Sequence, residues 1–381
     1  MTNQEISKIL PIIGAIAGDI IGSSYELIGS RTKDYNFDLF NNNSSYTDDT
    51  VLTIAVVKWL LNDSIPLQQI ILSMGKRYMD VGFGHAFKEW LRSNNPKPYN
   101  SWGNGSAMRV SAVALKTYDL KTALLIAKET AIITHNHPEG IKGAQAVTAA
   151  MFLARNGFTK GNIKDYIENT FKYNLSRRIE DIRDTYSFDS SCQGSVPEAI
   201  IAFLQSSDFE DAIRLAVSLG GDADTQACIT GAIAASFYNE MPSRISNYIF
   251  EKLPEEFTDI LEEFCKSDIS AKASVILTTK ENLYIDSYMK YTFALAVTDF
   301  TKVFIPKGTI LLVDINAREC SIVHILNYKE QIFSRIEKEL QKKYPEATEG
   351  HPYLCNGVLL KLHNSMYDKF YISEATEDEF F

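Results

Sequence analysis

Several features that define whole classes of protein are missing from this chain of 381 residues. The 5 cysteines are odd in number and widely spaced, and no CxxC pair occurs, which indicates reduced thiols and neither a disulfide framework nor a zinc site. Positive charge is not in excess: the formal net charge is −10, which argues against a nucleic-acid partner. The apolar stretch 9–21 is too short to span a bilayer and contains Asp19. We therefore expect a cytoplasmic protein with no signal peptide and no membrane partner.

What is present predicts two domains, because 381 residues exceed what one hydrophobic core usually serves. Helical periodicity continues to about residue 266, and the predicted helices include 9–28, 51–61, 67–79, 121–133, 140–155, 163–173, 196–204, 209–219 and 224–237. β-Branched and aromatic runs then predict strands at 291–297, 303–305, 309–313, 321–326 and 358–362, with one amphipathic helix at 329–343. The predicted fold is an all-α main domain, residues 1–268, and a smaller C-terminal α+β domain, residues 285–381, which carries no recognisable motif.

The stretch Thr47-Asp48-Asp49-Thr50 stands directly before an apolar, helix-like run. One interpretation is a helix cap, because Thr or Asp before such a run satisfies the free N–H groups of the first turn. A cap uses only one side chain, however, and two adjacent carboxylates repel each other unless a cation is present. A second acidic stretch, Gly220-Gly221-Asp222-Ala223-Asp224-Thr225, offers the same hard oxygen donors that Mg²⁺ or Mn²⁺ prefers.

The first predicted helix carries glycines at positions 14, 18 and 22, four residues apart and hence on one face. Each would weaken a helix by about 1 kcal/mol relative to alanine, so their presence predicts that another backbone comes very close. Packing alone does not explain Asp19 and Glu26, because an acid in an apolar helix must be paired, hydrogen-bonded or bound to a metal.

Residues 81–102 are rich in glycine, proline and aromatics, and we expect little regular structure there. The segment 100–109 follows, with glycines on both sides of Asn104 and an apolar run, 110–115, that predicts a helix start. A glycine-rich loop entering a helix can bind phosphate, although many such loops are only turns. Two loop histidines, His135 and His137, lack the further ligands that a zinc site needs, so either a ligand contact or plain packing is expected.

Five of these stretches occur in an order that resembles the ADP-ribosylglycohydrolase family, the group containing the dinitrogenase-reductase-activating glycohydrolases. They are 14–22 with Glu26, Thr47-Asp48-Asp49-Thr50, Gly103-Asn104-Gly105 through Arg109, Thr134-His135, and 220–225. The resemblance covers roughly residues 9–266. It implies an all-helical domain that holds two Mg²⁺ (or Mn²⁺) ions.

By motif match, the resemblance implies metal ligands at Thr47, Asp48, Asp49, Asp222, Asp224 and Thr225, with Glu26 nearby. The implied substrate-binding residues are Ser101, Trp102, Gly103, Asn104, Gly105 and His135. Glu26 and Asp48 are the candidates for acid–base catalysis, and Asp19 is interpreted as a structural brace.

The implied reaction is hydrolysis of the bond that joins C1″ of ADP-ribose to an acceptor, on a modified protein or a small molecule. Some arginine-directed members carry an aspartate where Ser101 stands here, so arginine, serine and other O-linked acceptors all remain open.

A non-catalytic ADP-ribose-binding or immunity protein is the alternative, although such a protein could lose acids that this chain retains. In a third interpretation, residues 285–381 recognise a protein partner or block the active site of a toxin, as an immunity protein would.

Overall fold

The structure is a computed structural model that describes residues 1–62, 64–117, 120–267 and six strands between 291 and 374. The chain divides into two units, Met1–Ser270 and Ala271–Phe381, and each is described by itself. In the first unit the described elements are α1 (Asn3–Lys8), α2 (Leu10–Ser23), α3 (Asp48–Leu61), α4 (Leu67–Arg77), α5 (His85–Arg92), η1 (Asn104–Ser106), α6 (Val113–Lys116), α7 (Leu120–Ile132), α8 (Pro138–Arg155), α9 (Lys160–Phe171), α10 (Ile179–Thr185), α11 (Cys192–Gln205), α12 (Phe209–Val217), α13 (Ala223–Tyr238), α14 (Ser243–Lys252) and α15 (Glu255–Lys266).

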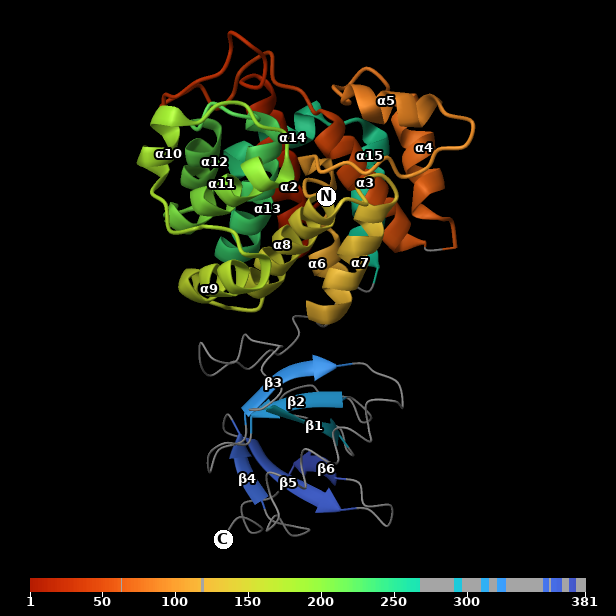
Figure 1. Cartoon of the computed structure of the whole chain (residues 1–381), viewed down its shortest axis with the longest axis vertical. Helices are drawn as coiled ribbons and strands as arrows, with labels where there is room; N and C mark the ends of the chain where they lie inside the picture. The colour runs from red at the N-terminus through yellow and green to blue at the C-terminus, as the bar shows by residue number, and fades with distance from the viewer. Residues whose placement is uncertain are drawn as a thin grey trace. The chain divides into compact units, whose positions relative to one another are not determined.

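Helices α2 and α13 lie side by side in the middle of the helical unit, with α11 and α12 on one side and α3 on the other (Figure 1). Both are apolar around most of their circumference, as expected for helices that other helices surround. Peripheral helices such as α15 instead bury one face, formed by Phe257, Leu261 and Phe264. The sequence therefore places its most uniformly apolar segments at the centre of the unit.

The glycines of α2 allow this central pair to approach backbone to backbone. A Cβ atom built on Gly18 would lie 1.9 Å from the carbonyl oxygen of Ala227. Gly14 meets Gly231 and Gly22 meets Ala223, with the same Cβ-to-oxygen distance of 2.4 Å, so the two helices run antiparallel. The predicted close approach of a second backbone is confirmed, and the partner is the helix that begins with the second acidic stretch.

Three local predictions were wrong. Helix α2 ends at Ser23, so Glu26 lies in the turn beyond it and not on the helix. The region 81–102 contains α5, which buries the aromatic face formed by Phe87 and Trp90. The glycine-rich loop enters the single 3₁₀ turn η1, and α6 begins only at Val113, so an α-helix does not follow the loop directly.

In the second unit, the described residues form one mixed sheet with the strand order β3-β2-β1-β6-β5-β4. The strands are β1 (Tyr291–Ala296), β2 (Ile310–Asp314), β3 (Ser321–Leu326), β4 (Pro352–Cys355), β5 (Val358–Asn364) and β6 (Phe370–Glu374). The central β1–β6 pair is parallel and the other pairs are antiparallel. Four of these strands were predicted, and β4 and β6 were missed. The predicted helix 329–343 and the predicted strand 303–305 lie outside the described residues.

Candidate functional site

Three acidic side chains meet in one cluster at one end of the central helix pair, where α2 ends and α13 begins. Glu26 follows the end of α2, and Asp222 and Asp224 stand at the start of α13. One carboxylate oxygen of each lies within 4.8 Å of the others. Glu26 is half-buried, whereas Asp222 and Asp224 are only 5% and 4% exposed. The antiparallel crossing therefore brings together acids that are almost two hundred residues apart in the sequence.

The first acidic stretch is held in place by Asp19, a fully buried residue of α2. Its carboxylate accepts hydrogen bonds from the backbone N–H groups of Thr47 and Thr50 at 2.9 and 3.1 Å, and from their hydroxyls at 2.6 and 2.5 Å. Asp19 therefore fastens the first turn of α3 to α2. This geometry matches the interpretation of Asp19 as a brace.

Bracing also orients the Thr47 hydroxyl. The hydroxyl gives its one hydrogen to Asp19, and its oxygen accepts the N–H of Asp49 at 3.3 Å, as an N-cap does. A hydroxyl oxygen has two lone pairs, so one remains available. The cap interpretation and the ligand interpretation of Thr47 are therefore compatible with each other.

The two acidic stretches are in direct contact. The Thr225 hydroxyl donates to Oδ1 of Asp49 at 3.3 Å, while Oδ2 of Asp49 is buried without a hydrogen-bond partner among the described residues. Asp48 is half-buried, its N–H donates to the carbonyl of Val81, and its Oδ1 lies beside Gly82. Asp48 and Asp49 are not members of the three-residue cluster, but Thr225 connects Asp49 to its edge.

The carboxylates at this site are costly to ionise together. Burial, followed by the charge of Asp19, raises the pKa of Asp48 to about 8. Burial and the neighbouring aspartates also raise the pKa values of Asp49 and Asp224 well above the ordinary range. Burial and the charge of Asp222 raise the pKa of Glu26. Carboxylates this close demand either shared protons or a cation.

The glycine-rich loop is tied to the acid cluster through Asn104. Its side-chain amide donates to Oδ2 of Asp222 at 2.7 Å and to the hydroxyl of Ser195 at 3.1 Å. The loop is also paired with the segment before α11 by an isolated bridge between Gly103 and Ser191. Asn104 was predicted to bind substrate. In the structure its side-chain amide holds the carboxylate of Asp222 in place.

His135 and Trp102 flank the same loop. His135 is 4% exposed, and its Nε2 lies 3.5 and 3.2 Å from the positions that Cβ atoms on Gly103 and Gly105 would occupy. Trp102 is 52% exposed, with its ring 5.6 Å from that of His137. Ser101 is half-buried, and its hydroxyl accepts the N–H of Gly103. The predicted substrate-binding residues are therefore assembled around one loop.

Two residues near the site were not anticipated from the sequence. The Nε of Arg31 donates to the carbonyl of Glu26 at 2.8 Å, and its guanidinium lies 4.4 Å from the ring centre of Phe188. Arg31 thus connects the turn that contains Glu26 to the segment around Phe188, which leads to Ser191, the residue paired with Gly103. No local sequence pattern identifies such a pair, because its members are more than 150 positions apart.

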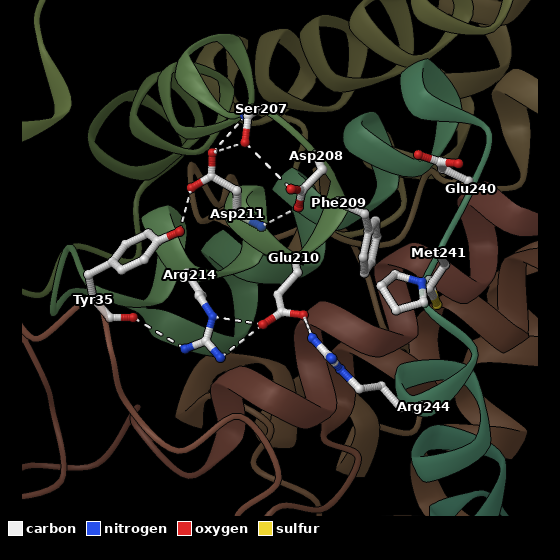
Figure 2. Close-up of a pocket in the computed structure, with 11 residues that line it drawn as sticks. Tyr35, Ser207, Asp208, Phe209, Glu210, Asp211, Arg214, Glu240, Met241 and Arg244 are labelled. Carbon is white, nitrogen blue, oxygen red and sulfur yellow. Dashed lines mark hydrogen bonds and ion pairs between the residues drawn. The ribbon is translucent and has the colours of Figure 1, made fainter.

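A charged pocket of about 540 Å³ lies elsewhere on the unit, between Tyr35 and the first turns of α12 and α14. Arg214 and Arg244 both pair with Glu210 there, and the Tyr35 hydroxyl donates to Asp211 (Figure 2). These charges largely satisfy one another. The acid cluster at the end of α2 is therefore the better candidate for a functional site.

None of the described helices combines the length and the apolar character that a bilayer crossing requires. The structure is similar to a solved structure described as an ADP-ribosylglycohydrolase-related protein complex, with a TM-score of 0.55 and 20% identity over 72% of this chain and 100% of that chain. This likeness shows that the helical fold is shared.

Two of the relatives that sequence comparison finds show the range of the similarity. The ADP-ribosylhydrolase ARH3 of Mus musculus is 24% identical over 342 residues, which cover 69% of this chain and 89% of that protein. The ADP-ribosylarginine hydrolase Tri1 of Pseudomonas putida is 23% identical over 265 residues, which cover 60% of this chain and 69% of that protein. The sequence model of the ADP-ribosylglycohydrolases matches residues 9–277, which include every residue of the site described above. This chain belongs to the ADP-ribosylglycohydrolase family.

Proposed function

We propose that this chain hydrolyses the C1″ glycosidic bond between ADP-ribose and a modified acceptor, and that it needs divalent cations to do so. The observation that carries the proposal is the convergence of Glu26, Asp222 and Asp224 beside a glycine-rich loop that Asn104 fastens to Asp222. A non-catalytic binder would have no use for so many carboxylates whose charges oppose one another.

The donor set fits Mg²⁺ or Mn²⁺. All the groups are carboxylate or hydroxyl oxygens, which hard cations prefer, and no thiol or imidazole is among them. Asp49 Oδ2 is buried without a partner in the described part of the chain, as expected for an atom that awaits a ligand. We propose that two ions are held by Thr47, Asp48, Asp49, Asp222, Asp224 and Thr225, with Glu26 joining the second group.

The chain's own residues supply the remaining requirements of the reaction. Cleavage at C1″ builds positive charge on the ribose, and the carboxylates of this site stabilise such charge. Bound cations would supply charge that orients the ribose hydroxyls and makes nearby water more acidic. Glu26 is half-buried in a turn, and burial followed by the charge of Asp222 raises its pKa, which makes it a candidate to hold or release a proton in the reaction. Asp48 is the second candidate for this role.

The phosphates of ADP-ribose are assigned to the loop from Ser101 to Gly105. Glycine-rich backbone can approach a phosphate closely. Nε2 of His135 lies within 3.5 Å of the positions that Cβ atoms on Gly103 and Gly105 would occupy, so the ring is next to this backbone. The proposed acceptor is a modified protein side chain or a small molecule. Ser101 in the loop leaves both arginine and serine linkages as candidates.

The test is the release of free ADP-ribose from proteins modified on arginine and, separately, on serine, with and without Mg²⁺. Metal-dependent release from either substrate would establish the activity and name the linkage. The double variant Asp48→Asn/Asp224→Asn should bind no Mn²⁺ and release no ADP-ribose while its melting curve stays cooperative. Asp80→Asn, a change at an exposed aspartate, is the matched control and should behave as wild type. Full activity in the double variant would defeat the proposal.

A further inference from the structure

A fully buried guanidinium stands behind the glycine-rich loop. Arg109 is 0% exposed, and no carboxylate among the described residues pairs with it. Its Nη2 donates to the carbonyl of Thr130 at 2.6 Å and to the hydroxyl of Thr134 at 3.0 Å. Burying a charged group without a partner of opposite charge is unfavourable. The hydrogen bonds of Arg109 therefore indicate a role in addition to packing.

The direction of these hydrogen bonds is fixed by chemistry. Burial lowers the pKa of Arg109 to about 10, so the guanidinium stays protonated at neutral pH and can only donate. The Thr134 oxygen must therefore accept from Nη2, and the single hydrogen of its hydroxyl must find another acceptor.

That acceptor is the ring of His135. Its Nδ1 lies 2.7 Å from the Thr134 oxygen, and these are the two partners of that hydroxyl in the described structure. If Nδ1 carried a proton, it would also donate to Thr134, and the hydroxyl hydrogen would be buried without an acceptor. The network is satisfied only when Thr134 donates to an unprotonated Nδ1.

The ring is also uncharged. Burial, followed by the charge of Arg109, holds the pKa of His135 well below its ordinary value, so one ring nitrogen carries a proton and the other does not. With Nδ1 unprotonated, the proton is on Nε2. Nε2 faces Gly103 and Gly105, and it has no hydrogen-bond partner among the residues that the structure describes.

We propose that Arg109 and Thr134 are positioning residues that lock His135 in its Nε2–H tautomer, so that the glycine-rich loop presents a fixed hydrogen-bond donor to its ligand. Such a donor selects a ligand oxygen that can accept, such as a phosphate or ribose oxygen, and rejects a ligand N–H group at the same point. The identity of that ligand as ADP-ribose rests on the proposed function, whereas the tautomer does not.

The tautomer is directly measurable on the full chain. A two-bond ¹H–¹⁵N spectrum distinguishes a protonated ring nitrogen from an unprotonated one, and His135→Gln identifies the His135 signals among those of the 6 histidines. Wild type should show a proton on Nε2. Thr134→Val keeps the shape of the side chain but removes the hydroxyl, so both tautomers should appear. Thr134→Ser keeps the hydroxyl and should retain the wild-type spectrum.

The same variants separate this inference from the proposed function. ADP-ribose binding, measured by calorimetry, should weaken about tenfold or more in Thr134→Val and little in Thr134→Ser, as expected for a lost hydrogen bond to a charged group. A proton on Nδ1 in wild type, or an unchanged tautomer in Thr134→Val, would overturn the proposal. A chain with the Nε2–H tautomer but no affinity for ADP-ribose would support the lock and refute the assigned ligand.

Discussion

Gly22→Ala should damage the proposed cation site by displacing the backbone, because it replaces none of the proposed ligand residues. A Cβ atom at this position would lie 2.4 Å from the carbonyl oxygen of Ala223 and 2.6 Å from the Cα of Asp224. Ordinary contact begins at 3.4 Å, so the start of α13 must move by about 1 Å. Metal ligands tolerate displacements of only about 0.2 Å, so Asp222 and Asp224 should leave their positions relative to Glu26.

The magnitude follows from two opposing terms. Overpacking costs about 1–3 kcal/mol, and the gain in helix propensity from glycine to alanine offsets up to about 1 kcal/mol. We expect a net loss of about 1–2 kcal/mol in the free energy of unfolding and a melting temperature lower by roughly 5 °C. Mn²⁺ affinity, measured by calorimetry, should fall about 10–100-fold, the range seen when the support of a metal ligand is altered.

Gly14→Ala is the matched control, because its Cβ atom would meet the carbonyl oxygen of Gly231 at the same 2.4 Å, at the other end of the crossing. It should cost similar stability and leave Mn²⁺ affinity near that of wild type. Equal losses of affinity in the two variants would refute the reasoning, and so would a Gly22→Ala protein that binds Mn²⁺ normally.

Two further predictions concern the acids and the second unit. Between the ordinary aspartate pKa of 3.8 and the value of about 8 for Asp48, the folded state binds more protons than the unfolded state, so stability should fall as pH rises through this window. EDTA-treated protein should therefore melt several degrees lower at pH 8 than at pH 5, and added Mg²⁺ should raise the melting temperature more at pH 8. Differential scanning calorimetry measures both effects. Equal melting temperatures at the two pH values would contradict the raised pKa of Asp48. A chain that ends at Ser270 should fold and still cleave small ADP-ribosyl substrates, because the candidate site lies wholly in the first unit. If the second unit recognises modified proteins, the shortened chain should be less active on ADP-ribosylated proteins. Equal activity on small substrates and on modified proteins would exclude this role of the second unit.

Much of the helical fold could be predicted because the strongest signals are local. The glycine spacing of α2 indicated a close backbone contact, and the structure confirms it. β-Branched and aromatic runs also located four of the six described strands. The element α5 was missed because only eight residues, His85–Arg92, form it, and their helical pattern is surrounded by glycine and proline.

The residue types of the candidate site could be predicted from the sequence, but the contacts between these residues could not. Two acidic stretches and one glycine-rich loop stood out by residue type alone. Their connections did not, because Asn104 reaches Asp222 across 118 positions and Arg31 reaches Phe188 across more than 150. The spacing of residues along a chain carries no information about such contacts. The sequence likewise did not predict a role for Arg109. It marked this residue only as the end of the motif that begins at Gly103, whereas in the structure its side chain is fully buried.

The antiparallel pairing of α2 and α13 also has a consequence for the order of folding. It joins segments about two hundred residues apart, and the contact between Asp49 and Thr225 spans 176 positions. Closing so long a loop is entropically expensive and comes late, after local helices have formed. A cation held by both acidic stretches could therefore not nucleate this fold, because its proposed ligands lie far apart until the central pair has docked. Cation affinity should therefore appear only in the last kinetic phase of refolding, when the two central helices have docked.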